Sequence, residues 1–409
     1  MIRRLFLAAP VACLIAVPLA AEPGLPPAEA VEVALSQHPS VIAAHARLEA
    51  VQARADGIAK GPYEFTVQGT YQRRDVSGGK QFDEYDAQLS RPIRLPGKAR
   101  LDRAIGRYGT EVAENVAEDA KHEAALLLAA HWFDWLSASS QAAVDRAAAS
   151  NYEAALAAVE RRHSLRDAAQ LDVDRAAAML AEARRALAES EGLAAVARKR
   201  LETHFPALPL PVDAPEMPLP QIADARLSQL GDLVVVNSHM IAAAEAEAAR
   251  MGAVAARARA DRIADPTVGI RLFSEFGGLE RGAGVVLSMP LGGGHRRALA
   301  SEAGAGASAA RADEQLARYE VSETAEADMT EARFRMATWQ RARESVEAQM
   351  AALDKMRRGH QLGEIDLADL LLAERMVHDA FRTEAGARAE AIRAITKLRI
   401  DAHDLWLGD

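Results

Sequence analysis

The sequence contains almost no cysteine. Of its 409 residues only Cys13 is one, and it lies inside an N-terminal apolar run preceded by Arg3 and Arg4. This pattern predicts a secretory signal over residues 1–21, which we expect to be removed. The mature chain then has no cysteine, which excludes disulfides and thiolate metal ligands. A retained N-terminal anchor and lipidation of Cys13 are the alternatives.

Other absences narrow the class of protein. The formal net charge is −9 and no basic block occurs, so nothing indicates a nucleic-acid partner. No hydrolase, metalloprotease, Walker or dinucleotide-binding pattern occurs, and the eleven histidines are dispersed along the chain. We therefore expect no enzyme, no metal site and no cofactor. No window after the signal is apolar enough for a transmembrane helix, so entry into a membrane requires β-strands.

Long helices account for most of what is present. Aromatic residues make up only 5% of the chain, and Ala, Glu and Arg dominate it, which is typical of coiled coils. From Lys98 to Arg161 there is no proline, and a helix of about sixty residues reaches ~90 Å. Further helices are expected at about 28–60 and 223–262. Residues 171–201 carry a heptad seam, made of Val173, Leu180, Leu187, Ala194 and Leu201 beside Ala176, Ala183, Ser190 and Ala197.

Four short segments alternate apolar and polar residues instead. In "GPYEFTVQGTYQRRD" (61–75), one face carries Phe65, Val67, Gly69 and Tyr71, and the other carries Thr66, Gln68, Thr70 and Gln72. Gly-rich turns join the four segments into two pairs. Strands of about ten residues suit a transmembrane β-structure. Two soluble hairpins packed on the helices are the alternative.

The order of segments occurs twice. Residues 22–204 hold a helix, a hairpin at about 64–93 and a long helical pair, and residues 223–409 repeat this with a hairpin at about 266–290. The Pro-rich linker 205–222 separates the two halves. "LSRPIRLPGKARLDRA" matches "LSMPLGGGHRRALASEA", and "AAQLDVDRA" matches "LGEIDLADL". The long spacing indicates a duplicated half-protein, since solenoid repeats are much shorter.

This duplicated layout resembles that of the TolC-like outer membrane efflux proteins. "AVEVALSQHPSVIAAHARLEA" (30–50) is similar to the family's N-terminal helix start, and "LSRPIRLPGKARLDRA" (89–104) to its exit from the hairpin. "RRHSLRDAAQLDVDRAAAMLAEA" and "RRGHQLGEIDLADLLLAE" resemble its two helical tips. In the first tip Ala168 stands where the family usually has Gly, so a different turn is expected there. The lipid-bearing N-terminal cysteine of many relatives is absent.

The resemblance implies a fold that is mainly α with a β-barrel contribution. Each protomer supplies long coiled-coil helices and two β-hairpins, and a homotrimer forms a 12-stranded barrel continued by a periplasmic α-helical barrel. A single copy has four strands and cannot close, since a barrel needs about eight or more. The resemblance places the protein in the outer membrane of a Gram-negative bacterium, extending into the periplasm. Phe65, Val67 and Tyr71 would face lipid, and Thr66, Gln68 and Gln72 the pore.

The implied function is that of a passive export duct. It docks a periplasmic adaptor and an inner-membrane pump of the RND type. "LPGKARLDRA" favours the heavy-metal efflux branch, and drug efflux or type I secretion are the alternatives. A periplasmic coiled-coil adaptor protein is the alternative from a different class.

The resemblance places a gate and a docking surface at the helical tips. The gate, or periplasmic entrance, is expected to comprise Arg357, Arg358, Glu364, Asp366 and Asp369. The adaptor-docking residues are expected to be Arg162, Leu165, Leu171, Asp172, Gly359, Gly363 and Ile365. A carboxylate ring in a narrow mouth favours cations, and Arg357 and Arg358 are positioned to bind it when the mouth is closed. Capping of the helix N-terminus is the alternative role of the acidic residues.

Overall fold

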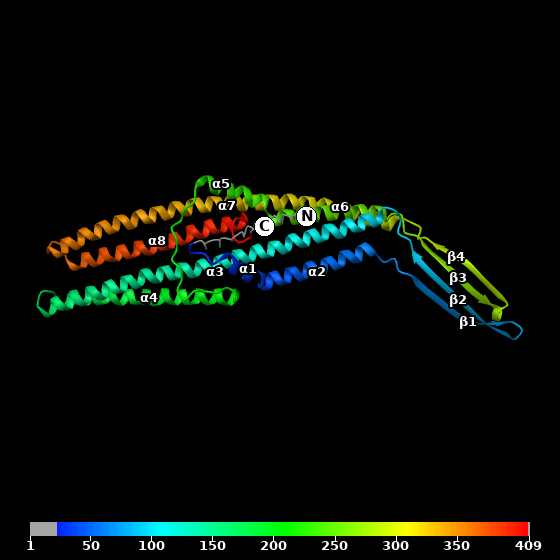
Figure 1. The fold of residues 1–409 in the computed structure, drawn as a ribbon, viewed down its shortest axis with the longest axis horizontal. Coiled ribbons are helices and arrows are strands. Elements are labelled where there is room, and N and C mark those ends of the chain that lie inside the picture. The colour runs from blue at the N-terminus through cyan, green and yellow to red at the C-terminus, as the bar shows by residue number, and fades with distance from the viewer. Residues whose placement is uncertain (1–22, 408–409) are drawn as a thin grey trace, which may run out of the picture.

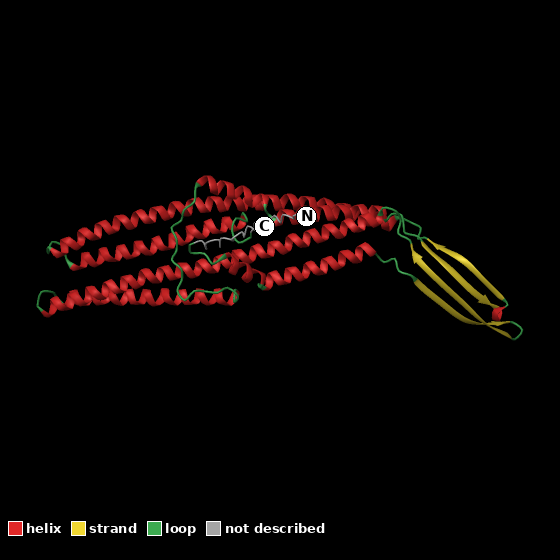
Figure 2. Cartoon of the chain, in the orientation of Figure 1, coloured by secondary structure: helices red, strands yellow, loops and turns green. Residues whose placement is uncertain are grey.

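The computed structural model describes residues 23–407 as a long helical bundle with a small antiparallel sheet at one end (Figures 1 and 2). The expected signal and Cys13 lie outside the described residues. Among residues 23–407, no helix combines the length and the apolar character that crossing a bilayer requires.

The first half of the chain has six elements. They are α1 (Ala28–Ser36), α2 (Pro39–Lys60), β1 (Thr66–Val76), β2 (Lys80–Pro92), α3 (Lys98–Ser164) and α4 (Gln170–His204). The helix expected at 28–60 is divided at His38, which is extended at φ −68° and ψ 134°. Pro39 causes this division, because proline disfavours the helical conformation of the residue before it and fits well as the first residue of a helix.

The second half repeats this order. Its elements are α5 (Asp224–Val236), α6 (His239–Ala260), β3 (Thr267–Glu275), the short 3₁₀ helix η1 (Phe276–Gly278), β4 (Glu280–Ser288), α7 (Gly294–Gln361) and α8 (Leu367–Asp401). The helix expected at 223–262 is also divided. Ser238 starts α6 by accepting a hydrogen bond from the Ile241 backbone N–H at 3.2 Å, as N-cap serines do.

Long helices form two antiparallel pairs. α3 has 67 residues, which corresponds to ~100 Å of helix, and it packs against α4, while α7 packs against α8. The small-residue stripe of the heptad seam predicted in α4 is buried, whereas Val173, Leu187 and Ala194 of its other stripe are half-buried. Ala176, Ala183, Ser190 and Ala197 are at most 8% exposed. This stripe of small side chains lets α4 approach α3 closely.

Helices follow the same order as the strands they continue. The sheet order is β1-β2-β3-β4, and next to it α2 packs against α3, α3 against α6, and α6 against α7. Each strand is joined to one of these helices, so the sheet and this end of the bundle form one curved wall that is four elements wide. α2 and α7 are its two edge helices. At the other end the order is α4, α3, α8, α7.

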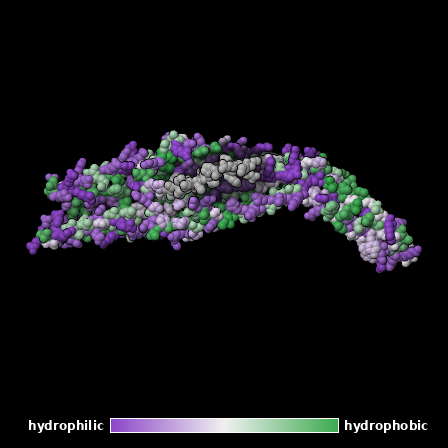
Figure 3. Space-filling view, in the orientation of Figure 1, coloured by the Kyte–Doolittle hydropathy of each residue, from purple (hydrophilic) through white to green (hydrophobic). Residues whose placement is uncertain are grey.

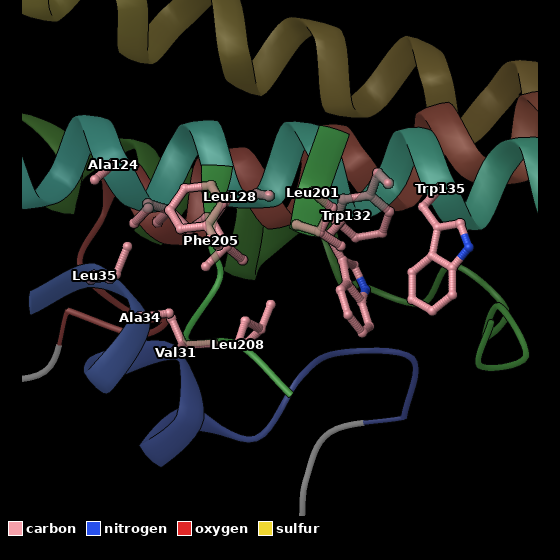
Figure 4. Close-up of a cluster of buried hydrophobic side chains, with 14 of the residues drawn as sticks. Val31, Ala34, Leu35, Ala124, Leu128, Trp132, Trp135, Leu201, Phe205 and Leu208 are labelled. Carbon is pink, nitrogen blue, oxygen red and sulfur yellow. The ribbon is translucent and has the colours of Figure 1, made fainter. Parts of the chain in front are cut away.

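The largest apolar core lies at the waist of the molecule, where α1, α3, α4 and the linker meet (Figure 4). Trp132 and Leu128 of α3 pack there with Leu201 of α4 and Phe205 just after it. The Trp132 indole N–H donates to the Gly24 carbonyl at 2.8 Å, which fixes the start of the chain to α3. The Pro-rich linker crosses the bundle at this level (Figure 1).

Candidate channel wall, elbow and helical tips

Strand register places the alternating residues of all four strands on common faces. Val67 pairs with Leu89, Leu89 with Ile270, and Ile270 with Val285. The next row is Gly69, Ala87, Leu272 and Ala283. Since paired residues of antiparallel strands point to the same side, these rows form one apolar face. The two predicted hairpins thus form a single sheet with one apolar side.

This apolar face is open to solvent. Val67 is 78% exposed, Val285 79% and Leu287 70%, and Figure 3 shows hydrophobic residues gathered over the sheet. Apolar surface of this extent on a protein marks a contact with lipid or another chain. The soluble alternative, hairpins packed on the helices, is wrong because the sheet extends beyond the end of the bundle (Figure 1).

Aromatic residues bound the apolar band at both ends. At the far end Tyr71 and Tyr85 are paired, with ring centroids 5.4 Å apart. Beside them Arg73 and Asp83 form an ion pair. At the near end the guanidinium of Arg91 lies 4.9 Å from the centre of the Phe65 ring. The strand between Phe65 and Tyr71 spans roughly 20 Å, close to the ~25 Å apolar band of outer-membrane barrels.

Polar side chains dominate the opposite face. Gln68 pairs with Gln88, and Gln88 with Arg271. Arg271 also forms an ion pair with Asp86. One aromatic residue on this face, Phe273, has its ring over Gly282, where an added Cβ would lie 2.3 Å from the ring. The face is therefore mainly hydrophilic, with the Phe273 ring packed against Gly282 of β4.

An elbow of buried charges joins the sheet to the helices. Lys98 is 2% exposed, and its Nζ lies 2.9 Å from Asp261 and 2.8 Å from Asp265. Beside it the Arg257 Nε contacts Asp102 at 2.6 Å. The two cations and three carboxylates come from both halves of the chain. These contacts hold the start of α3 to the end of α6 where both helices meet the strands.

Hydrogen bonds at the elbow keep its carboxylates charged. Burial disfavours the ionised form of Asp265, but hydrogen bonds from Lys98, the Leu95 backbone and Tyr63 outweigh this and lower its pKa. Burial, together with the bond to Asp265, raises the pKa of Tyr63 to about 12. Tyr63 therefore stays a donor, and its O–H lies 2.7 Å from the carboxylate. The lowered pKa favours the ionised form of Asp265 and so its ion pair with Lys98.

The two helical tips have the same backbone turn. Gly363 ends α7 at φ +75°, its N–H bonds the His360 carbonyl, and the N–H of Glu364 bonds the Gly359 carbonyl. Arg166 ends α3 at φ +62° with the equivalent bonds. This is the Schellman arrangement. Both turns lie at the end of the bundle away from the sheet (Figure 1).

Two expectations about the first tip are wrong. The position equivalent to a turn glycine is Arg166 and not Ala168, and the turn does not differ from that of the second tip. The equivalence also moves the alignment of the tips by three residues. In the structure Asp172 corresponds to Asp369, since each is the third residue of its helix. The sequence alignment of "AAQLDVDRA" with "LGEIDLADL" paired Asp172 with Asp366 instead. An arginine in the left-handed region concealed this correspondence.

Within a single protomer, Arg357 and the acidic gate residues make separate contacts. Asp366 is the N-cap of α8 and accepts a hydrogen bond from the Asp369 backbone N–H at 2.8 Å. Arg357 pairs with Glu374 of α8 at 3.3 Å and not with Asp366 or Asp369. Within one protomer the capping role of Asp366 therefore holds. Arg358 accepts, through its carbonyl, the N–H of Leu362.

Side chains at the tips link the two turns and leave leucines exposed. The Arg162 Nη1 donates to His360 Nε2 at 3.3 Å, and Arg162 also pairs with Asp167. Leu165 is 78% exposed and Leu362, at the equivalent position, 75%. Gly359 leaves room for Ile365, since an added Cβ would lie 2.6 Å from its Cδ1. Of the remaining docking residues, Leu171 is 56% exposed and the Asp172 carboxylate accepts the Ala169 N–H.

Sequence reasoning missed the histidines of the tips. His163 and His360 occupy equivalent positions, and the Nδ1 of each lies 2.9 Å from the carbonyl oxygen five residues further on. These carbonyls belong to Ala168 and Ile365. The signal was present as "RRH" and "RRGH" before the two turns, but the shifted alignment hid it. Each histidine closes its turn by donating to that carbonyl, and the neutral His360 ring then accepts from Arg162.

The comparisons with known proteins give similarity in structure only. No protein-family model and no curated protein sequence matches the chain. The outer membrane protein VceC from Vibrio cholerae is 16% identical, with a TM-score of 0.75 over 91% of this chain and 95% of VceC. The outer-membrane channel OprN is 21% identical, with a TM-score of 0.69 over 93% and 90% of the two chains. The open state of the MtrE outer membrane channel of Neisseria gonorrhoeae is 17% identical, with a TM-score of 0.67 over 93% and 89%.

In each comparison the similarity covers nearly the whole length of both chains. The resemblance predicted from the sequence is confirmed for the fold: this chain has the fold of the TolC-like outer membrane channels.

Proposed function

We propose that the chain is one protomer of a trimeric channel in the outer membrane of a Gram-negative bacterium, extending into the periplasm. The observation that carries this proposal is the open sheet. Within residues 23–407, the outer edges of β1 and β4 pair with no further strand. An unpaired strand edge cannot lie in lipid, where nothing replaces its missing hydrogen bonds.

Three copies together supply the strands that one copy lacks for a closed barrel. Joining β4 of one protomer to β1 of the next gives twelve strands, a closed barrel wide enough for a water-filled centre. The helices continue this closure, because α2 follows β1 at one edge of the wall and α7 follows β4 at the other. Exposed apolar side chains on these helices, such as Ile42 of α2 and Leu316 of α7, would be covered in the same step.

Orientation follows from the two faces of the sheet. The apolar rows of Val67 and Gly69 would face lipid, with Tyr71, Tyr85 and Phe65 at the two interfaces. The Gln68 and Arg271 face would line the pore. A wall with a hydrophilic inner surface and no catalytic constellation fits a passive duct that moves solutes and carries out no chemistry.

The tips would dock a periplasmic adaptor and, through it, an RND-type pump of the inner membrane. Leu165 and Leu362 support this, because equivalent exposed leucines at the far end present two similar contacts per protomer. Leu165→Glu with Leu362→Glu should abolish co-purification with the adaptor and leave the trimer intact. Val212→Glu, at a linker residue that is 86% exposed, is the matched control. Adaptor binding by the double variant would exclude this docking surface.

The same tips would hold the gate. Asp366 caps its own helix in one protomer, so a gating role belongs to Asp369 and Glu364, where three copies would form a carboxylate ring that attracts cations. Asp369→Asn with Glu364→Gln should weaken block by divalent cations in planar bilayers, whereas Asp366→Asn should not. Asparagine still caps a helix. Unchanged block in the Asp369 and Glu364 variant would exclude a gating role for these two carboxylates.

For the cargo we propose heavy-metal cations, with drugs and type I secretion substrates as alternatives. The motif that suggested metals, "LPGKARLDRA", lies in the elbow. There Lys98 pairs with Asp261, and Asp102 pairs with Arg257, so these charges are used within the fold and do not identify the cargo. The test is therefore made in cells. A strain lacking this chain should accumulate heavy metal until the gene is restored. Normal metal tolerance combined with drug sensitivity would favour drug efflux.

A further inference from the structure

A cavity of about 570 Å³ lies between the two halves of the protomer. Its walls come from α3, α7, α8 and the linker, represented by Val144, Leu353, Phe381 and Met217. It is far from the sheet and separate from the tip turns. Cavities of roughly 300–1,000 Å³ with mainly apolar walls and a few polar groups bind drug-sized organic molecules.

Tyr152 supplies an unused hydrogen-bond donor in this cavity. The residue is 3% exposed and lines the wall. Its hydroxyl is buried and has no hydrogen-bond partner among the described residues. Burial raises the pKa of Tyr152 to about 12, so the O–H keeps its proton. A buried hydroxyl left unpaired is unfavourable, and an oxygen acceptor on a bound molecule would satisfy it.

Several charged groups on the wall already have charged partners. Arg357 and Glu374 lie 3.3 Å apart, and Arg388 contacts Glu384 at 2.7 Å. The Nε2 of His378 lies 2.8 Å from Asp145, which is fully buried behind the wall. Beside these paired charges, the Tyr152 hydroxyl is a buried donor without a hydrogen-bond partner among the described residues.

We propose that this cavity binds an apolar, ring-containing organic molecule that presents an oxygen acceptor to Tyr152. The wall joins α3 of the first half to α7 and α8 of the second half, so a bound molecule would brace the two long helical pairs against each other. Its walls do not include the proposed docking leucines Leu165 and Leu362, and the proposal does not depend on what the duct exports.

Binding of 8-anilinonaphthalene-1-sulfonate by the full-length mature protein in amphipol tests this proposal. The probe has aromatic rings and sulfonate oxygens, and its fluorescence rises on leaving water. Ala147→Phe and Ala143→Phe fill the cavity from exposed positions of α3 and should each weaken binding at least tenfold. Ala158→Phe, at an exposed position of α3 outside the cavity, is the matched control and should bind as wild type does. Tyr152→Phe should bind about two- to tenfold more weakly, the usual effect of one lost hydrogen bond.

Circular dichroism and size-exclusion chromatography establish that each variant is folded. The expected result is saturable binding of one probe per protomer, lost in both filling variants and kept in the control. Absence of saturable binding by wild type overturns the proposal, and so does unchanged binding by folded Ala147→Phe and Ala143→Phe. Equal affinity of Tyr152→Phe and wild type overturns the role of the hydroxyl.

Discussion

Replacing Lys98 by methionine should weaken the elbow strongly. The change removes the cation that lies between Asp261 and Asp265 and leaves both carboxylates without it. Breaking a buried pair in this way costs about 3–5 kcal/mol. Because the side chain of Asp261 is 47% exposed and keeps its ion pair with Arg257, part of the loss is compensated, and we expect about 3 kcal/mol, the lower end of that range.

The loss is measured as a shift in the thermal unfolding midpoint of the purified protein. With a few degrees per kcal/mol for a large domain, Lys98→Met should unfold about 6–12 °C lower. Lys199→Met is the matched control, since Lys199 is 77% exposed and pairs only with Glu202 on the surface. Its midpoint should stay close to that of wild type.

A second substitution separates an unpaired charge from lost packing. In the Lys98→Met background, Asp265→Asn removes one uncompensated carboxylate and should restore part of the midpoint. Equal midpoints for Lys98→Met and Lys199→Met would refute the clamp. A further decrease in the double variant would show that Asp265 stabilises the elbow through the hydrogen bonds it accepts from Tyr63 and Leu95, and not through its charge.

Three further predictions test the sheet, the tips and the contact between α7 and α8. Val67→Arg should impair membrane assembly, because a charge facing the bilayer centre costs about 2–4 kcal/mol, whereas Gln68→Arg should assemble and change conductance; equal effects on assembly would contradict the assigned faces. Gly363→Ala should speed hydrogen exchange at the second tip, because a Cβ at φ +75° costs about 1 kcal/mol. Arg166→Ala is the control and should not speed exchange at the first tip, since arginine already has a Cβ. If Gly363→Ala exchanges at the rate of wild type, backbone strain is excluded. Burial, together with a hydrogen bond to Asp401, raises the pKa of Asp328 to about 6, so its contribution to stability is full below its unfolded pKa and is lost as pH rises through about 6. Asp328→Asn should remove that part of the pH dependence of the unfolding midpoint. An unchanged profile would show that the pKa of Asp328 is not raised in the folded protein.

Periodic patterns made the fold predictable. The heptad seam of α4 and the alternation around Val67 each report one buried or apolar face, and the structure has both. Duplication made the order of elements predictable. The breaks at His38 and Asn237 were not foreseen, because a helix-favouring composition on both sides outweighed the short local signals.

The contacts of the site were less predictable than its place in the fold. Each tip joins two long helices, so its position at the end away from the sheet follows from chain order. The pairing of Arg357 with Glu374 depends on how α7 and α8 are rotated, which spacing alone does not fix. The elbow clamp joins Lys98 to Asp265 across 167 positions of the chain, and the cavity at Tyr152 needs four separate segments. No local pattern contains such information.

The central claim is that three copies close the open wall, and native mass spectrometry in detergent tests it most directly. The mature protein should enter the membrane fraction, require detergent for extraction and give a single species with three times the protomer mass. Recovery from the periplasm as a water-soluble monomer would contradict both the trimer and the barrel.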